Sequence, residues 1–117
     1  MVTIPAGGRY SEEWRLNLDG GGVSIKISTT PDEADVMQFE YTLVTPTIWF
    51  DMSEINMLIT SLFNKLGFTV TSDNPDCIQL VCPAGDTACN DAYLFPSDNQ
   101  ATHACVDTTN MVVNLGP

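Results

Sequence analysis

Two cysteines and the chain's only histidine lie close together in the stretch CNDAYLFPSDNQATHAC, residues 89–105. A thiol beside an imidazole can act as a nucleophile, a cluster of cysteine and histidine can bind zinc, and a pair of oxidised cysteines staples a loop. In an extended segment, His103 and Cys105 point to the same face. The cysteines therefore decide first whether this region does chemistry or only holds a surface in place.

All four cysteines, Cys77, Cys82, Cys89 and Cys105, lie in a late stretch rich in Asp, Asn, Pro and Ser. An even number of cysteines in such a stretch favours disulfides that hold loops. Zinc sites use closely paired ligands, whereas the intervals here are four, six and fifteen residues. A Cys–His nucleophile is disfavoured by the expected oxidation of Cys105. We predict disulfides, no metal site and no cofactor, with His103 as an ordinary exposed strand residue.

The composition excludes several classes of partner. Fifteen acidic residues against four basic ones in 117 residues give a net charge of −11, which repels phosphate backbones and anionic membranes. Nucleic acid is therefore not an expected partner. No apolar run is long enough to span a bilayer, and MVTIPAGGRY lacks the layout of a signal peptide. We expect one soluble domain over residues 1–117, cytosolic or already processed, with no membrane insertion.

Alternation of apolar and polar residues predicts β-strands along most of the chain. A hairpin is expected from strands 12–18 and 23–28 around the glycine-rich turn 19–22, with Trp14, Leu16 and Leu18 facing inward. Further short strands are expected over 37–44, 47–51, 68–72, 78–81, 101–105 and 111–115. This many short strands separated by Asp, Asn, Pro and Gly favour an antiparallel sandwich or barrel.

One segment has helical periodicity. In SEINMLITSLFNKLG, apolar residues recur at helical spacing, with Ser53 placed to cap the start and Gly67 to end the helix. We predict a short helix over residues 54–66. It would form a lid on the sheets or, alternatively, bind a partner protein.

Five segments in order resemble the thaumatin-like family, most closely its small secreted fungal branch of yeast-phase-specific and antigenic proteins. They are IPAGGRYSEEWRLNLDGGGVSIKIS, FEYTL, IWFDMSEIN, CPAGDTACNDAY and PSDNQATHACVDTTNMVVNLGP. The resemblance implies a mainly β, antiparallel thaumatin-like sandwich, secreted or in the cell wall. It also implies the disulfides Cys77–Cys105 and Cys82–Cys89. Against the family pattern, the single domain at 1–117 is expected to lack the first strand and the insertion domain.

The resemblance also implies a site, because large members of the family have an acidic cleft that binds β-1,3-glucan and sometimes cleaves it. Its acidic positions match Glu40, Asp51 and Asp98. Another family acid corresponds to Ile48, and the cleft arginine falls near Ile27. Lys26 is adjacent, but alternation points it to the opposite face from Ile27.

The resulting expectation is a non-catalytic protein that binds cell-wall glycan, β-1,3-glucan, through an acidic and aromatic surface. Its expected ligand-binding residues are Glu40, Asp51, Asp98, Trp49 and Tyr93. Trp14, Phe50 and Phe95 are further possible stacking platforms. The alternatives are a weak endo-β-1,3-glucanase that uses Glu40 and Asp51, and an effector or antigen that binds a host or microbial surface protein. The three acids could also be ordinary solvated residues.

Overall fold

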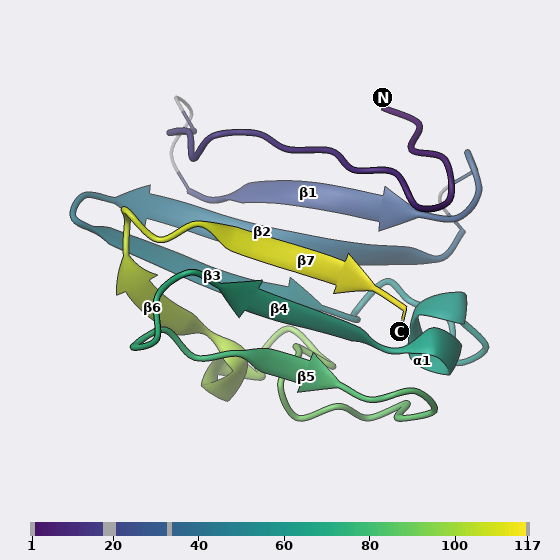
Figure 1. Cartoon of the computed structure of the whole chain (residues 1–117). Helices are drawn as coiled ribbons and strands as arrows, with labels where there is room; N and C mark the ends of the chain where they lie inside the picture. Colours follow the sequence, from purple (N-terminus) through teal and green to yellow (C-terminus); the bar gives the residue numbers. More distant parts are fainter. Residues whose placement is uncertain (1, 18–20, 33, 117) are drawn as a thin grey trace.

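The structure, a computed structural model, describes residues 2–17, 21–32 and 34–116, and it contains two antiparallel sheets (Figure 1). The larger sheet has the order β1-β2-β3-β6, from Val23–Ser28, Val36–Val44, Thr47–Ser53 and His103–Val106. The smaller has the order β5-β4-β7, from Leu80–Cys82, Phe68–Ser72 and Met111–Leu115. The predicted mainly β sandwich is therefore confirmed.

The core lies between the two sheets. Alternate residues of the larger sheet, among them Met37, Phe39, Ile48 and Phe50, are buried in one cluster with Phe68, Val70 and Leu80 of the smaller sheet. Because side chains alternate along a strand, the residues between these positions form the outer face of the larger sheet. This outer face carries the site described below.

The predicted strands at 23–28, 68–72 and 111–115 have the bounds of β1, β4 and β7, and those at 37–44 and 47–51 lie within β2 and β3. The strand predicted at 101–105 begins only at His103, because Asn99–Ala101 forms the short 3-10 helix η1. The strand predicted at 78–81 is shorter and shifted to β5. Turn formation next to a strand explains both differences, since alternation alone does not mark where a turn ends.

The prediction of a strand over residues 12–18 is wrong over its described part, because residues 12–17 form no strand. Trp14 packs against Phe39 and Tyr41, and its Nε1 donates to the carbonyl of Thr109 at 3.1 Å. Leu16, predicted to face inward, is 65% exposed. The indole of Trp14 thus anchors a segment that forms no strand. Leu18 and residues 19–20 of the predicted turn lie outside the described residues.

The helix predicted over 54–66 is also wrong in extent, because helix α1 covers only Leu62–Leu66. Ser61 caps it, accepting from the Phe63 amide through Oγ at 3.1 Å. Upstream, the Leu58 amide donates instead to Asp35 Oδ1 at 2.8 Å. Because a side chain from another part of the chain takes this amide, residues 55–56 and 59–60 form separate turns and no continuous helix. The apolar stripe is not a lid, since Ile59 is 79% exposed.

Two disulfides staple the later half of the chain. Cys77, in the loop between β4 and β5, is bonded to Cys105 on β6, and Cys82 at the end of β5 is bonded to Cys89. These are the pairs that the family resemblance implied. The first bond joins a loop of the smaller sheet to the edge strand of the larger one.

In the described residues, no helix is long and apolar enough to cross a membrane.

Candidate functional site

The strand register assembles the outer face of the larger sheet in rows. Glu40 on β2 lies between Ser24 on β1 and Asp51 on β3. In the next row, Thr42 pairs with Trp49, and Trp49 pairs with Ala104 on β6. Residues that pair across strands share a face of the sheet, so this topology brings together an acid from each of two strands and an aromatic side chain.

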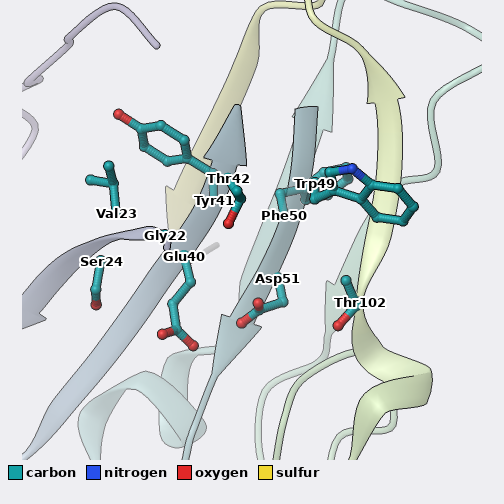
Figure 2. Close-up of a pocket in the computed structure, with 10 residues that line it drawn as sticks. All are labelled: Gly22, Val23, Ser24, Glu40, Tyr41, Thr42, Trp49, Phe50, Asp51 and Thr102. Carbon is teal, nitrogen blue, oxygen red and sulfur yellow. The ribbon is translucent and has the colours of Figure 1, made fainter. Parts of the chain in front are cut away.

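These rows border an open cavity of about 390 Å³ (Figure 2). Its lining consists of Gly22, Val23, Ser24, Glu40, Tyr41, Thr42, Trp49, Phe50, Asp51 and Thr102. Glycine at position 22 brings the chain close to β2, because a Cβ there would lie 2.9 Å from the Thr42 Oγ1. The lining thus combines three aromatic residues, of which Trp49 is exposed, with hydroxyl and carboxyl groups.

Glu40 and Asp51 form a carboxyl pair within the cavity. Figure 2 shows their carboxyl ends side by side on the same side of the sheet. Burial, a hydrogen bond with the Glu40 side chain and the charge of Glu40 together raise the pKa of Asp51 to about 8. Two carboxylates on paired residues of neighbouring strands repel each other, which disfavours ionisation of both groups. The pair therefore holds one proton at neutral pH.

No ion pair neutralises these carboxyls among the residues that the structure describes, where the ion pair seen joins Arg15 to Glu12. Lys26 pairs with Gln38 in the register, so it lies on the outer face as a diagonal neighbour of Glu40. The family's cleft arginine had been matched to Ile27, which packs against the core. The alternation of side chains along β1 predicted that Lys26 and Ile27 point to opposite faces. Lys26 therefore shares the outer face with Glu40.

A chain of polar contacts extends the face beyond the cavity. Ser24 Oγ donates to Gln38 Oε1 at 2.7 Å, and Gln38 Nε2 donates to Asn56 Oδ1 at 2.6 Å. No motif in the sequence pointed to Gln38 or Asn56 as part of a site. The alternation of β2, which places Gln38 on the same face as Glu40, was the available signal, but the partner in the loop at Asn56 depends on the tertiary fold.

Trp49 is the exposed aromatic residue of the cavity. Its side chain is 47% exposed, and its cross-strand neighbours Thr42 and Ala104 are small. Small neighbours leave the indole uncovered, so a flat apolar group could pack on it. On another side of the cavity, the Thr102 hydroxyl contacts the hydroxyl of Tyr93. Tyr93 itself is not part of the lining, and it supports Thr102 instead.

The other candidate ligand residues do not present an exposed side chain to the cavity. Asp98 is buried and accepts a hydrogen bond from the Leu94 amide through Oδ2 at 3.3 Å, so it stabilises its own loop. Phe50 is in the lining, but it is only 1% exposed and belongs to the core. Trp14 is anchored on that core, and Phe95, although exposed, is not in the lining. The three acids thus do not converge: the structure brings together Glu40 and Asp51, without Asp98.

The cysteines and the histidine of the stretch 89–105 do not form a reactive centre. Cys105 is held in its disulfide. His103 was predicted to be exposed, but it is half-buried, with its ring 5.7 Å from that of Phe50 and its Nε2 lacking a hydrogen-bond partner. Pairing of Phe50 with His103 in the register turns the imidazole inward, and burial lowers its pKa. In the described part of the chain, no three His, Cys, Asp or Glu side chains are grouped to hold a metal.

Comparison with known proteins places this chain in a family. The model of the family described as "Bys1: Blastomyces yeast-phase-specific protein" matches residues 1–116. The secreted thaumatin-like protein calA of Emericella nidulans is 40% identical over 99% of this chain, which spans 67% of that protein. An antigenic thaumatin-like protein of Arthroderma benhamiae is 38% identical over 98% of this chain, which spans 57% of that protein.

A solved structure shows the same fold at lower identity. The crystal structure of the protein elicitor MoHrip2 from Magnaporthe oryzae has a TM-score of 0.71 at 19% identity, and the match covers 94% of this chain and 75% of that one. Because the family model matches nearly the whole chain and two relatives reach 38–40% identity, the chain belongs to the Blastomyces yeast-phase-specific protein (Bys1) family, among the secreted thaumatin-like proteins of fungi.

Proposed function

We propose that the protein is secreted and binds cell-wall glycan, β-1,3-glucan, on the outer face of its larger sheet, without cleaving it. The observation that carries this proposal is the uncovered indole of Trp49 beside two carboxyls and two threonine hydroxyls in one open cavity. A sugar ring has an apolar face that packs on an aromatic ring and hydroxyls that both donate and accept hydrogen bonds. The indole of Trp49 matches the apolar face of a sugar ring, and the carboxyls and threonine hydroxyls match its hydroxyl groups.

The geometry of the carboxyl pair favours binding over hydrolysis. Glycosidases hold their two carboxyls at least about 5 Å apart, so that the sugar carbon or a water molecule fits between them. Glu40 and Asp51 are direct cross-strand partners, close enough for Glu40 to raise the pKa of Asp51. The third acid matched to the family cleft, Asp98, is buried in its own loop. We therefore disfavour the glucanase alternative.

The test is a pull-down on insoluble β-1,3-glucan at pH 5, with chitin and cellulose as controls and an assay for released sugar. Replacing Trp49 with alanine is expected to weaken retention about tenfold, equivalent to about 1.4 kcal/mol, because the stacking surface is lost. Phe95→Ala is the matched control, since Phe95 is similarly exposed at 52% but lies outside the cavity lining. Circular dichroism would verify that both variants are folded.

Three outcomes would contradict parts of the proposal. Equal losses in the Trp49 and Phe95 variants would mean that this cavity is not the binding site. Sugar release that disappears in Glu40→Gln would establish the glucanase. Absence of retention on every glycan would favour a protein partner, for which the exposed apolar residues of the segment 55–66, Ile55, Leu58, Ile59, Leu62 and Leu66, offer the surface.

A further inference from the structure

We propose that the Glu40–Asp51 pair makes this face pH-dependent, such that a single proton held between the two carboxyls is required for glycan binding and its loss in alkali releases the ligand. This inference rests on the proposed glycan-binding function and adds its regulation.

The geometry of the pair supports a shared proton. Glu40 and Asp51 are direct cross-strand partners, and both line the cavity. Asp51 Oδ1 is buried and has no hydrogen-bond donor. Two carboxylates facing each other without donors repel strongly, whereas one added proton turns the repulsion into a hydrogen bond. Burial and the neighbouring Glu40 raise the pKa of Asp51 to about 8, which agrees with this arrangement.

The titratable groups near the Glu40–Asp51 pair come from several neighbouring elements. On β1, Lys26 faces outward one row away, next to Gln38. Thr102, which directly precedes β6, lines the cavity. On β6, Ala104 faces outward beside Trp49, while His103 pairs with Phe50 on the inward side. Tyr93 approaches through its hydroxyl contact with Thr102. Tyr41 also lines the cavity from β2, although it is 2% exposed and belongs to the core cluster. Among the described residues, Lys26 is not ion-paired to the carboxyls.

The protonation state changes what the pair offers to a sugar. With one proton, it presents an O–H donor and several acceptor oxygens, which suits the hydroxyls of a neutral glycan. With none, two adjacent charges must lose their hydration against an uncharged ligand, and this desolvation opposes binding. The net charge of −11 cannot produce the same effect, because a neutral polysaccharide is not repelled by it.

The experiment measures retention on insoluble β-1,3-glucan from pH 5 to pH 9.5, together with carboxyl ¹³C NMR titration of the free protein. We expect retention to fall about tenfold or more between these limits, with a midpoint near pH 8 that matches the titration of Asp51. Asp51→Asn keeps a neutral group in place of the shared proton, so its retention should stay constant with pH. Asp76→Asn, an exposed acid in the β4–β5 loop, is the matched control and should behave like the wild type.

The outcomes separate the inference from the proposed function. Equal retention at pH 5 and pH 9.5 would leave glycan binding intact and overturn the pH dependence. A pH-dependent loss that persists unchanged in Asp51→Asn would overturn the role of the pair. Absence of retention at every pH would overturn both, even where NMR shows a carboxyl that titrates near pH 8.

Discussion

Loss of the Cys77–Cys105 disulfide, in the double variant Cys77→Ala/Cys105→Ala, is expected to lower the free energy of unfolding by about 3.5 kcal/mol. The bond closes a separation of 28 residues, and in the chain-entropy model a longer loop gives a larger stabilisation. It also joins the β4–β5 loop of the smaller sheet to β6 at the edge of the larger one. The same variant should therefore bind glycan more weakly, because β6 carries Ala104 beside Trp49.

Denaturant unfolding monitored by circular dichroism measures this effect. The matched control is Cys82→Ala/Cys89→Ala, which opens a separation of only 7 residues and should cost about 2.5 kcal/mol. Both variants remove one disulfide and add two alanines, so the difference between them isolates the loop that is closed. A larger cost for the short loop would contradict the entropic explanation.

The free energy of unfolding is expected to be highest at about pH 4–5 and to fall by about 2–3 kcal/mol towards pH 9. This magnitude allows roughly one pKa unit, equivalent to about 1.4 kcal/mol, for each of two carboxyls, because solvent screening reduces the effect at Asp51. Asp51 has its pKa raised from 3.8 to about 8. Glu54 has its pKa raised from 4.5 to about 7 by burial and by the charge of Asp86. A folded state that keeps these protons while the unfolded chain releases them loses stability as the pH rises through both windows.

The surroundings of Glu54 explain why its neutral form is favoured. Its side chain is 7% exposed, and the Asn64 amide donates to its Oε1 at 2.8 Å and to the Asp86 carbonyl oxygen at 3.3 Å. Its Oε2 is buried without a partner. Ionisation would place a poorly paired charge between the end of β3, helix α1 and the loop closed by Cys82–Cys89, which is unfavourable.

Other groups limit stability at acidic pH. Burial lowers the pKa of His103, so its contribution is lost as the pH falls from 6.5 through the lowered value. Hydrogen bonds from Thr30 and Ala34 lower the pKa of Asp32, and bonds from Asn110 lower that of Asp73. The contributions of these two acids are lost below pH 3.8. The stability curve should therefore have an acidic limb as well as an alkaline one.

Denaturant unfolding of the wild type, Asp51→Asn and Glu54→Gln at several pH values tests the alkaline limb. Each amide removes one titration, so each variant should gain about 1–2 kcal/mol relative to the wild type at pH 9 and little at pH 4. Asp76→Asn serves again as the exposed control. Variants that follow the wild-type curve in parallel would show that these two carboxyls do not determine the alkaline limb.

The sequence by itself determined those strands whose alternating apolar face is buried against the rest of the fold. In β1, β2 and β3, apolar residues recur at every second position, and burying that face fixes which side chains point inward. The same alternation places Glu40, Thr42, Trp49 and Asp51 outward. Recognition of the family from its ordered segments then gave the fold, and it implied the two disulfide pairs that the structure contains.

Tertiary structure decided the features that depend on contacts distant in sequence. Residues 12–17 alternate like a strand, yet the packing of Trp14 on Phe39 and Tyr41 holds them without one. Residues 54–66 have helical periodicity, but Asp35, 23 positions before Leu58, accepts the amide that a longer helix would need. Periodicity describes which face can be buried, and it contains no information about which distant side chain competes for the backbone.

The site shows the same division. The family resemblance selected Glu40, Asp51 and Asp98 as equals. Only the register made the first two neighbours, whereas Asp98 is buried in its own loop. The raised pKa of Asp51 likewise required a second carboxyl and burial, which are properties of a location. Sequence determined which side chains face outward, because that follows from a period of two residues. The fold decided which of them meet, because strand order and register bring together residues that are far apart in the chain.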